Sequence, residues 1–377
     1  RDRATGIEEE TLAYRLMGNW DPVSVSFKEL VLEPQLEEQF SKPYPFYLAY
    51  PLEVAPEDLG APSQWVMEHK WDGIRAQLIC RNKTLFIWSR GEELVTEQYP
   101  EFQVLSDVLP PGTVLDGELL PFPDGRVGSF KDLQKRLGRK KVSRRLLKET
   151  PVILRAYDLL EWEGVDLRNK PFHYRNHLLG TLLDQLRKSG QQYPLDRSVA
   201  LDIPNWESAA LERERSREKH SEGLMLKRRD APYRVGRKKG DWWKWKVDPF
   251  TIDAVLTYAM RGHGRRTNLF TDYTFALWDE NESGERELVT FAKAYSGLTD
   301  AELRLIDAWI KKKTLERFGP VRSVTPYHVF EIAFEGIAYS KRHKSGVATR
   351  FPRILRWRKD KSPEEANSLA DLKLLIP

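Results

Sequence analysis

Segments in which every second residue is apolar run through the middle of the chain and predict a fold built largely on β-strands. Ile74, Ala76, Leu78 and Cys80 follow this period, which is typical of a half-buried strand. Residues 82–83, Asn-Lys, predict a turn into the next strand. The further strand candidates are residues 84–89, 114–120, 152–160, 222–228 and 242–247.

Two helices are predicted among these strands, so the overall class is α+β. Residues 171–190 place apolar or aromatic residues four apart and end at Gly190, as a helix does. Thr299 and Glu302 have the spacing of a capping box before "DAELRLIDAWIKKK". After residues 248–253, "DPFTID", strand-like segments, turn residues and this one helix predict a small β-barrel domain.

The beginning of the chain differs from the rest. Residues 1–42 are predicted to be mainly helical, with Thr5 and Glu8 as a capping box, and residues 41–46 are a proline-rich linker. The chain does not begin with methionine, so we expect it to be a fragment. We predict a helical tail with its linker at 1–42, a first domain at 43–247 and a β-barrel domain at 248–377.

Composition excludes several classes of protein. A single cysteine, Cys80, excludes a disulfide framework and a cysteine-based zinc site. No apolar run approaches the roughly 18 residues of a membrane span, and residues 1–10 lack the apolar segment of a signal peptide. We expect a soluble intracellular protein. The sequence has no GxxxxGK[ST], HExxH or GxSxG motif, and we interpret His69, His173 and His177 as structural.

Basic residues are concentrated in three stretches, although the formal net charge is only +5. Residues 135–148 hold eight basic residues and no acidic one, residues 227–246 hold nine against two, and residues 341–361 hold nine against one. Together with the nearby aromatic residues, they favour a polyphosphate or nucleic-acid partner. The alternative is three solvated faces, balanced by acidic runs such as residues 211–222.

"EHKWDGIR", residues 68–75, places charged residues between two predicted strands, as either a solvated turn or a reaction centre. An ordinary lysine keeps its proton at neutral pH because its pKa is about 10.4, so a nucleophilic Lys70 needs desolvation or nearby cations. Spacing alone does not show that other charges converge on Lys70. The candidate cations are Arg75, Lys227, Lys244 and Lys246, and the candidate carboxylates for Mg²⁺ are Glu118 and Glu222.

Seven motifs, in this order, resemble those of the covalent nucleotidyltransferases and most closely those of ATP-dependent DNA ligases. KxDG alone recurs by chance, whereas seven motifs in register are specific. The resemblance begins near residue 45 and implies a nucleotidyltransferase (adenylation) domain of antiparallel sheets flanked by helices, followed by an OB-fold β-barrel. The motifs are "KWDGIR" (70–75), "SRGE" (89–92), "LDGEL" (115–119), "RAYDLL" (155–160), "EGLMLK" (222–227), "WWKWK" (242–246) and "RFPRILRWRKDK" (350–361).

The resemblance implies that Lys70 attacks the α-phosphate of ATP to give lysyl-AMP, with Mg²⁺ or Mn²⁺ as the metal. AMP then passes to the 5′-phosphate at a nick in duplex DNA, and the 3′-OH expels it. Glu68 would read the adenine edge, and Tyr157 would stack on the base. Arg75 would contact the ribose and Arg90 a phosphate, and Glu118 and Glu222 would bind the ribose or the metal. The α-phosphate would be contacted by Lys227, Lys244 and Lys246. Arg358 and Lys361, which flank Asp360, would orient the pyrophosphate.

The remaining residues of the lysine motif are assigned supporting roles. Gly73 is predicted to allow a tight turn after Lys70. We expect an orienting hydrogen bond from Asp72 and core packing from Trp71.

Other functions stay open on the sequence alone. An mRNA-capping guanylyltransferase shares the lysine motif and the barrel, an RNA ligase is a second enzymatic alternative, and an inactive nick-binding protein is the non-enzymatic one. One cysteine cannot build the zinc module of NAD-dependent ligases. Residues 292–303 and 342–354 resemble bacterial ligases, which implies an accessory repair enzyme of the cytoplasm or nucleoid. We expect it to act as a monomer and to lack most of an N-terminal DNA-binding domain.

Overall fold

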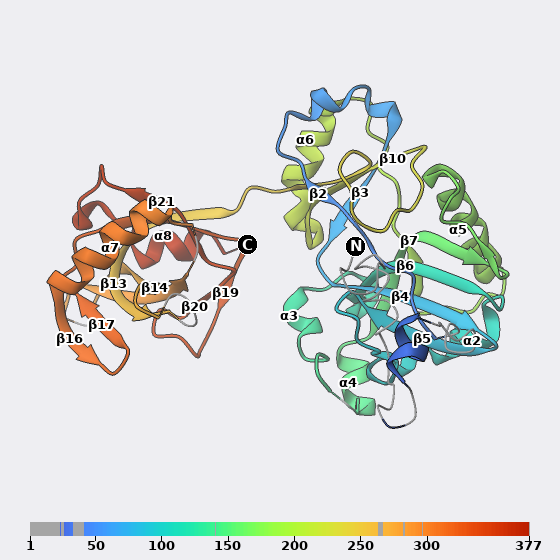
Figure 1. Cartoon of the computed structure of the whole chain (residues 1–377), viewed down its shortest axis with the longest axis horizontal. Helices are drawn as coiled ribbons and strands as arrows, with labels where there is room; N and C mark the ends of the chain where they lie inside the picture. Colours follow the sequence, from blue (N-terminus) through green and yellow to red (C-terminus); the bar gives the residue numbers. More distant parts are fainter. Residues whose placement is uncertain are drawn as a thin grey trace. The chain divides into compact units, whose positions relative to one another are not determined.

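The chain divides into two compact units, residues 1–247 and residues 248–377, which are considered separately (Figure 1). The computed structural model describes residues 23, 26–32, 41–139, 141–262, 267–281, 283–295 and 297–376. Of the helical region predicted at 1–42, only residues 23, 26–32 and 41–42 are described, and they include a π-helical turn at Lys28–Leu32. Among the described residues, no helix is both long enough and apolar enough to cross a membrane.

The larger sheet of the first unit is antiparallel except for one short strand, β9 (Leu195–Arg197). The sheet order is β5 (Thr84–Ser89), β4 (Ile74–Arg81), β6 (Thr113–Pro121), β7 (Val152–Trp162) and β8 (Val165–Asp166), with β9 parallel to β7. The predicted turn between β4 and β5 is confirmed. Asn82 and Lys83 have φ values of 49° and 56°, as a two-residue hairpin turn with matching twist requires.

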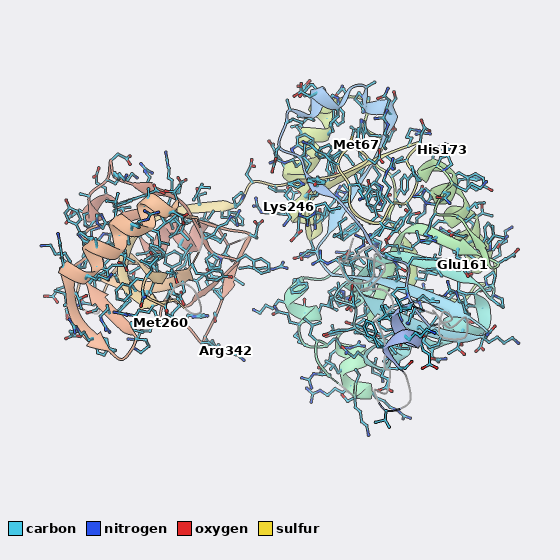
Figure 2. All side chains as sticks on the ribbon, viewed as in Figure 1. Met67, Glu161, His173, Lys246, Met260 and Arg342 are labelled. Carbon is cyan, nitrogen blue, oxygen red and sulfur yellow. The ribbon has the colours of Figure 1, made fainter. Side chains whose placement is uncertain are left out.

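A second sheet carries the lysine motif and two other motifs. Its order is β2 (Tyr50–Pro51), β12 (Trp242–Lys246), β10 (Ser221–Arg228) and β3 (Trp65–Trp71). The short strands β1 (Tyr47–Leu48) and β11 (Gly236–Arg237) form a parallel pair. Helix α6 (Trp206–Glu214) packs on this sheet through a buried cluster that includes Met67, Trp206 and Trp243. Figure 2 labels Met67, which belongs to β3.

The main core of the first unit lies between the larger sheet and a helix. The helix predicted within residues 171–190 is confirmed as α5 (Phe172–Arg187), which lies along β7 in Figure 1. Its Leu179, Leu182 and Leu183 join the same buried cluster as the inward residues of β4, β6 and β7. The other helices of this unit are short: α2 (Leu105–Val108), α3 (Phe130–Leu133) and α4 (Arg144–Glu149).

The second unit is a curved sheet with one long helix. The sheet order is β15 (Arg286–Ala294), β14 (Phe270–Glu280), β13 (Phe250–Arg261), β17 (Val321–Val324) and β16 (Thr314–Phe318), and β18 (Val329–Phe334) pairs with both β13 and β21 (Arg353–Arg358). The predicted capping box of Thr299 and Glu302 is confirmed at the start of α7 (Asp300–Lys313). The remaining elements are the hairpin β19 (Gly336–Tyr339) and β20 (Val347–Arg350), and α8 (Leu369–Leu374).

Candidate active site

A cavity of about 290 Å³ in the first unit is lined by strands of both sheets. Every site residue predicted within residues 43–247 lines it, although these residues come from separate parts of the sequence. The predicted residues are Glu68, Lys70, Arg75, Arg90, Glu118, Tyr157, Glu222, Lys227, Lys244 and Lys246, and the cavity is completed by Leu48, Ala49, His69, Trp71, Met225, Arg237 and Trp242.

Lys70 lies one residue before the end of β3, and the chain turns into β4 directly after it. Gly73 is in this turn, and a Cβ atom at this position would lie 2.3 Å from the Leu119 carbonyl oxygen and 2.9 Å from Glu118 Cγ. Glycine is therefore needed here for close packing against β6, rather than for the left-handed φ that a tight turn can require. This packing keeps Lys70 beside β6.

The amine of Lys70 belongs to a cluster of cations around one carboxylate. Lys70 Nζ donates a hydrogen bond to Glu222 Oε2 at 2.5 Å, and Lys246 Nζ lies 3.3 Å from the same oxygen. Burial acts to raise the pKa of Glu222, but these two ammonium groups outweigh it and hold the pKa below its ordinary value. Burial and its cationic neighbours lower the pKa of Lys244. A cluster of this kind is suited to bind phosphate oxygens.

Glu118 and Glu222 are the residues that could hold a metal ion. Burial raises the pKa of Glu118 to about 8, against the opposing effect of Lys70 and Arg75. Within the described part of the chain, no three His, Cys, Asp or Glu side chains form a metal-binding group. Mg²⁺ on a nucleotide requires only one or two protein carboxylates, because phosphate oxygens and water complete its shell. The two glutamates therefore fit a metal that arrives with a nucleotide.

A second, fully buried ion pair lies in the cavity wall. Lys227 Nζ is 3.1 Å from Glu68 Oε2, and both side chains are only 1% exposed. Burial raises the pKa of Glu68, while the Lys227 ammonium opposes this shift. Glu68 Oε1 has no hydrogen-bond partner within normal limits, although the Ser198 hydroxyl is near enough to the carboxylate to lower its pKa. The Lys227 ammonium also lies 4.2 Å from the ring centre of Tyr157 and 4.9 Å from that of Trp242, in cation–π contact.

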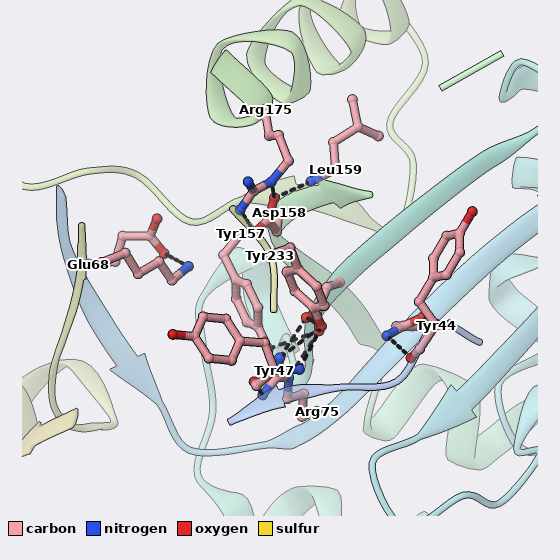
Figure 3. A network of polar contacts seen from close by, with 12 residues as sticks. Tyr44, Tyr47, Glu68, Arg75, Tyr157, Asp158, Leu159, Arg175 and Tyr233 are labelled. Carbon is pink, nitrogen blue, oxygen red and sulfur yellow. Dashed lines mark hydrogen bonds and ion pairs between the residues drawn. The ribbon is translucent and has the colours of Figure 1, made fainter. Parts of the chain in front are cut away.

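The guanidinium of Arg75 is held by a network that includes the aromatic wall of the cavity (Figure 3). Its Nε and Nη2 donate to the two oxygens of Asp116 at 3.1 and 2.7 Å, and its Nη1 donates to the Tyr47 carbonyl oxygen at 2.7 Å. Asp116 also accepts hydrogen bonds from the hydroxyls of Tyr157 at 3.2 Å and Tyr233 at 2.6 Å. Most donors of Arg75 are thus engaged within the protein, and the network fixes the ring of Tyr157.

The other two predicted site residues, Arg358 and Lys361, belong to the second unit. Both contact the same oxygen of Asp253, Arg358 through Nη1 and Lys361 through Nζ, each at 2.7 Å. Arg358 also donates to Asp360 through Nε and Nη2. The position of Asp360 between the two cations was predicted, whereas Asp253 was not.

The first basic stretch is not uniformly available to a ligand. Arg136 is fully buried, where it donates to both oxygens of Glu101 at 2.9 and 3.0 Å and to the carbonyl oxygens of Gln98 and Thr150. Its role is therefore structural. Among the described residues of this stretch, the cations that are exposed and can meet a partner are Lys135, Arg139, Lys141, Arg144, Arg145 and Lys148.

Two family models match the chain in the regions that hold these residues. The ATP-dependent DNA ligase domain matches residues 47–246, which include the cavity. The ATP-dependent DNA ligase C-terminal region matches residues 266–361, which include Arg358 and Lys361. The chain belongs to the ATP-dependent DNA ligase family. The predicted family and fold class, a nucleotidyltransferase domain followed by an OB-fold domain, are confirmed.

Relatives within this ligase family are found in bacteria and archaea. A probable DNA ligase of Koribacter versatilis (strain Ellin345) is 36% identical over 87% of the chain and 59% of its own length. A DNA ligase 1 of Korarchaeum cryptofilum (strain OPF8) is 33% identical over 97% of the chain and 66% of its own length. The chain thus spans about three fifths to two thirds of the length of these relatives.

A solved structure supports the same architecture for this ligase family member. A Lig E DNA ligase aligns with a TM-score of 0.55 over 84% of the chain and 100% of its own length, at 18% identity. At this identity, the likeness concerns the fold alone.

Several residues of the site were not predicted. Arg237 lies inside the second basic stretch, and Trp242 and Asp116 lie inside the motifs at 242–246 and 115–119, but no role was predicted for them. Arg237 and Trp242 line the cavity, and Asp116 anchors Arg75. The available signal was an arginine within a basic stretch and an aspartate two residues before Glu118, on the same face of its strand. Leu48, Ala49 and Met225 gave no sequence signal.

Proposed function

We propose that the chain is the catalytic core of a DNA ligase that seals nicks in duplex DNA at the expense of ATP, acting as a monomer. The main support is the position of Lys70 in a cavity that the family model covers. Its amine is bound to Glu222, which Lys246 also contacts. The wall of the same cavity holds Glu68, Lys227 and Tyr157. Such a cavity offers one nucleophile, a cluster of phosphate-binding cations and an aromatic surface for a base.

The proposed reaction has three steps. The neutral Lys70 amine attacks the α-phosphorus of ATP, the bond to the bridging oxygen of pyrophosphate breaks, and the nitrogen loses its proton. A 5′-phosphate oxygen of nicked DNA then attacks the same phosphorus and releases the lysine amine. Finally, the 3′-OH attacks the 5′-phosphate, loses its proton and expels AMP. Lys244 and Lys246 stabilise the charge that develops on the α-phosphate.

A divalent cation held by Glu118 and Glu222 would neutralise phosphate charge in the first step. Before nucleotide binds, Glu222 is occupied by Lys70 and Lys246. The nucleotide and its metal therefore have to compete with the nucleophile for this carboxylate. We assign Arg358 and Lys361 to the leaving pyrophosphate, so the second unit would have to close over the first during this step.

We assign the selection of adenine to Glu68 and Lys227 together, so that Lys227 reads the base rather than the α-phosphate. The 6-amino group of adenine is a donor, and N1 is an acceptor. The Glu68 carboxylate, an acceptor, and the Lys227 ammonium beside it, a donor, match this pattern. Guanine presents an acceptor at position 6 and a donor at N1, which would leave both protein groups mismatched and buried. This argument favours ATP over the GTP of a capping enzyme.

Exposed cations provide the proposed contact with DNA. Phe351, in the third basic stretch, is 64% exposed and has a φ of 52°, an uncommon backbone state for a bulky residue that is often retained for function. It lies between Arg350, whose guanidinium carbon is 5.0 Å from the Phe351 ring centre, and Arg353, which pairs with Glu335 at 2.9 Å. An exposed apolar side chain thus has two half-buried cations beside it. Since each neutralised phosphate contributes about −0.9 to the log–log slope on duplex DNA, binding should weaken steeply with salt.

The direct test is mass spectrometry of the chain after incubation with ATP and Mg²⁺. We expect an added AMP on Lys70, no addition with GTP, and conversion of a nicked DNA duplex to a sealed strand. Lys70→Arg keeps the positive charge and should abolish both adduct and sealing, whereas Lys170→Arg, an exposed lysine, is the matched control.

Each alternative has its own result. Sealing by Lys70→Arg would contradict the mechanism, and an adduct with GTP but not ATP would indicate a guanylyltransferase. Preference for a nicked RNA duplex would indicate an RNA ligase. Tight nick binding without any adduct in the wild type would identify a binding protein.

A further inference from the structure

A buried aspartate in the second unit holds both cations that we assign to pyrophosphate. Asp253 lies on β13, and its side chain is 8% exposed. One oxygen, Oδ2, accepts hydrogen bonds from Arg358 Nη1 and Lys361 Nζ, each at 2.7 Å. The two nitrogens are therefore held no farther apart than about twice that distance. Two like charges at such a separation repel one another unless an anion lies between them.

The backbone around Asp253 is fixed, so its carboxylate has a defined place. The Asp253 N–H donates to Asn367 Oδ1 at 3.0 Å, and the Asn367 N–H donates to the Asp253 carbonyl oxygen at 3.0 Å. On its other side, Asp253 pairs with Glu331 of β18, the strand that also pairs with the strand of Arg358. Asp253 is thus positioned by a central strand of the sheet, independently of the loop that carries Lys361.

The second carboxylate near Arg358 differs from Asp253 in exposure. Asp360 accepts from Nε and Nη2 of Arg358, the paired edge that also suits phosphate oxygens. However, the Asp360 side chain is 65% exposed, and exposed pairs contribute little stability. An incoming phosphate can replace Asp360 on that edge, whereas Asp253 stays on the opposite side of the guanidinium and keeps it in place.

We propose that Asp253 is the positioning residue for phosphate recognition by the second unit: it holds Arg358 and Lys361 side by side so that both engage the leaving pyrophosphate together. This inference rests on the proposed function, because it assumes that the chain takes AMP from ATP. Asp253 itself does not touch the nucleotide. Its removal should slow AMP uptake from ATP while leaving the sealing step, in which no pyrophosphate takes part, largely intact.

The experiment compares Asp253→Asn with Glu331→Gln. Glu331 is a suitable control because it is the strand neighbour of Asp253 and also binds an arginine of β21, Arg356 at 2.7 Å, but holds neither Arg358 nor Lys361. For each variant, the single-turnover rate of AMP uptake is measured against ATP concentration. The sealing of a pre-adenylylated nicked duplex, which needs no ATP, is measured in parallel.

We expect Asp253→Asn to slow AMP uptake at least about tenfold, because small displacements of positioning groups have effects of this size or larger. Sealing of the pre-adenylylated nick should stay within about twofold of wild type, and Glu331→Gln should leave both rates within about twofold. If Asp253→Asn does not fold, Asp253→Glu replaces it, with slower uptake and unchanged sealing again expected.

Three results would overturn the inference. AMP uptake by the Asp253 variant equal to that of Glu331→Gln would show that no positioning is needed. Faster uptake would show that Asp253 restrains the two cations instead of presenting them. Equal loss of uptake and sealing would show a general structural role. Absence of AMP uptake in the wild type would instead refute the proposed function, and it is read separately from the variants.

Discussion

Replacement of Lys227 by methionine tests the buried ion pair on which we base the selection of adenine. Methionine has a similar length and no charge, so it would fill the space but leave the Glu68 carboxylate without its cation. Both side chains are 1% exposed in the wild type, so little water is in place to replace the lost ammonium beside Glu68. Breaking a buried pair from one side commonly costs about 3–5 kcal/mol.

The loss of stability has an upper limit, because the Glu68 carboxylate can become neutral by taking up a proton. With an ordinary pKa of about 4.3, protonating a glutamate at pH 7 costs about 3.7 kcal/mol, or about 1.4 kcal/mol per pH unit. In the wild type, Lys227 opposes the burial shift of the Glu68 pKa, so its loss raises the folded-state pKa further above the unfolded value. The stability deficit of the variant therefore grows as the pH rises above about 4.3 and shrinks as it falls. We expect a deficit of no more than about 4 kcal/mol at pH 7 and no more than about 1 kcal/mol at pH 5.

The assay is urea denaturation of the wild type and Lys227→Met at both pH values, followed by the double variant Glu68→Gln/Lys227→Met. A neutral amide needs no counter-ion, so the double variant should recover most of the stability at pH 7. It should not recover AMP uptake, because Glu68 and Lys227 would no longer match adenine. A deficit below about 1 kcal/mol at pH 7, or the same deficit at both pH values, would refute the reasoning.

Three further changes test other parts of the chain. Arg175→Met leaves the fully buried Asp158 without its bidentate partner, and we expect the free energy of unfolding to fall by about 3–5 kcal/mol in urea denaturation. Gly73→Ala places a methyl group 2.3 Å from a backbone oxygen of β6 and should cost about 1–3 kcal/mol and also lower AMP uptake measured by mass spectrometry. Thr299→Ala removes the hydroxyl of the capping box and should lower the free energy of unfolding by about 1 kcal/mol at pH 7. Hydrogen bonds from Thr299 lower the pKa of Glu302, so part of this loss depends on the ionised Glu302 carboxylate. That part should disappear below about pH 4 in a denaturation series.

Features governed by neighbouring residues were predictable from the sequence. The hairpin turn at residues 82–83 and the capping box of Thr299 each depend on a few adjacent positions, and both were predicted correctly. The strands that carry the motifs were also predicted, because their apolar period is local. The convergence of these strands on one cavity was inferred only from the resemblance.

Features governed by strand register were not predictable in this way. Arg75 lies opposite Glu118 across β4 and β6, yet its guanidinium binds Asp116, the diagonal neighbour on the same face. A shift of the register by two residues would exchange these partners without any change in the apolar pattern. Charge counting has the same weakness, because Arg136 was counted as a surface cation but is buried by its pairing with Glu101.

The distribution of charge inside the cavity explains why one orientation of a nucleotide should be favoured. Lys227 and Arg75 are each neutralised by a buried carboxylate, Glu68 and Asp116. Around these pairs the cavity is polar and aromatic but carries little net charge. An uncharged base can occupy such a region, with Tyr157 as its stacking surface, whereas a triphosphate would gain little there.

The cavity carries a net positive charge near the opposite end of β10. Glu222 lies near the start of this strand and Lys227 near its end, and at Glu222 a single carboxylate is shared by Lys70 and Lys246, with Lys244 also in the cavity wall. Cations therefore exceed anions at this end, and Coulomb attraction in a partly dry cavity draws phosphate oxygens there. A nucleotide bound with its base beside Lys227 consequently presents its α-phosphate to Lys70. Under the proposed function, this polarity would select Lys70 as the nucleophile. The polarity arises from the pairing of cations with buried carboxylates and not from the number of basic residues in the sequence.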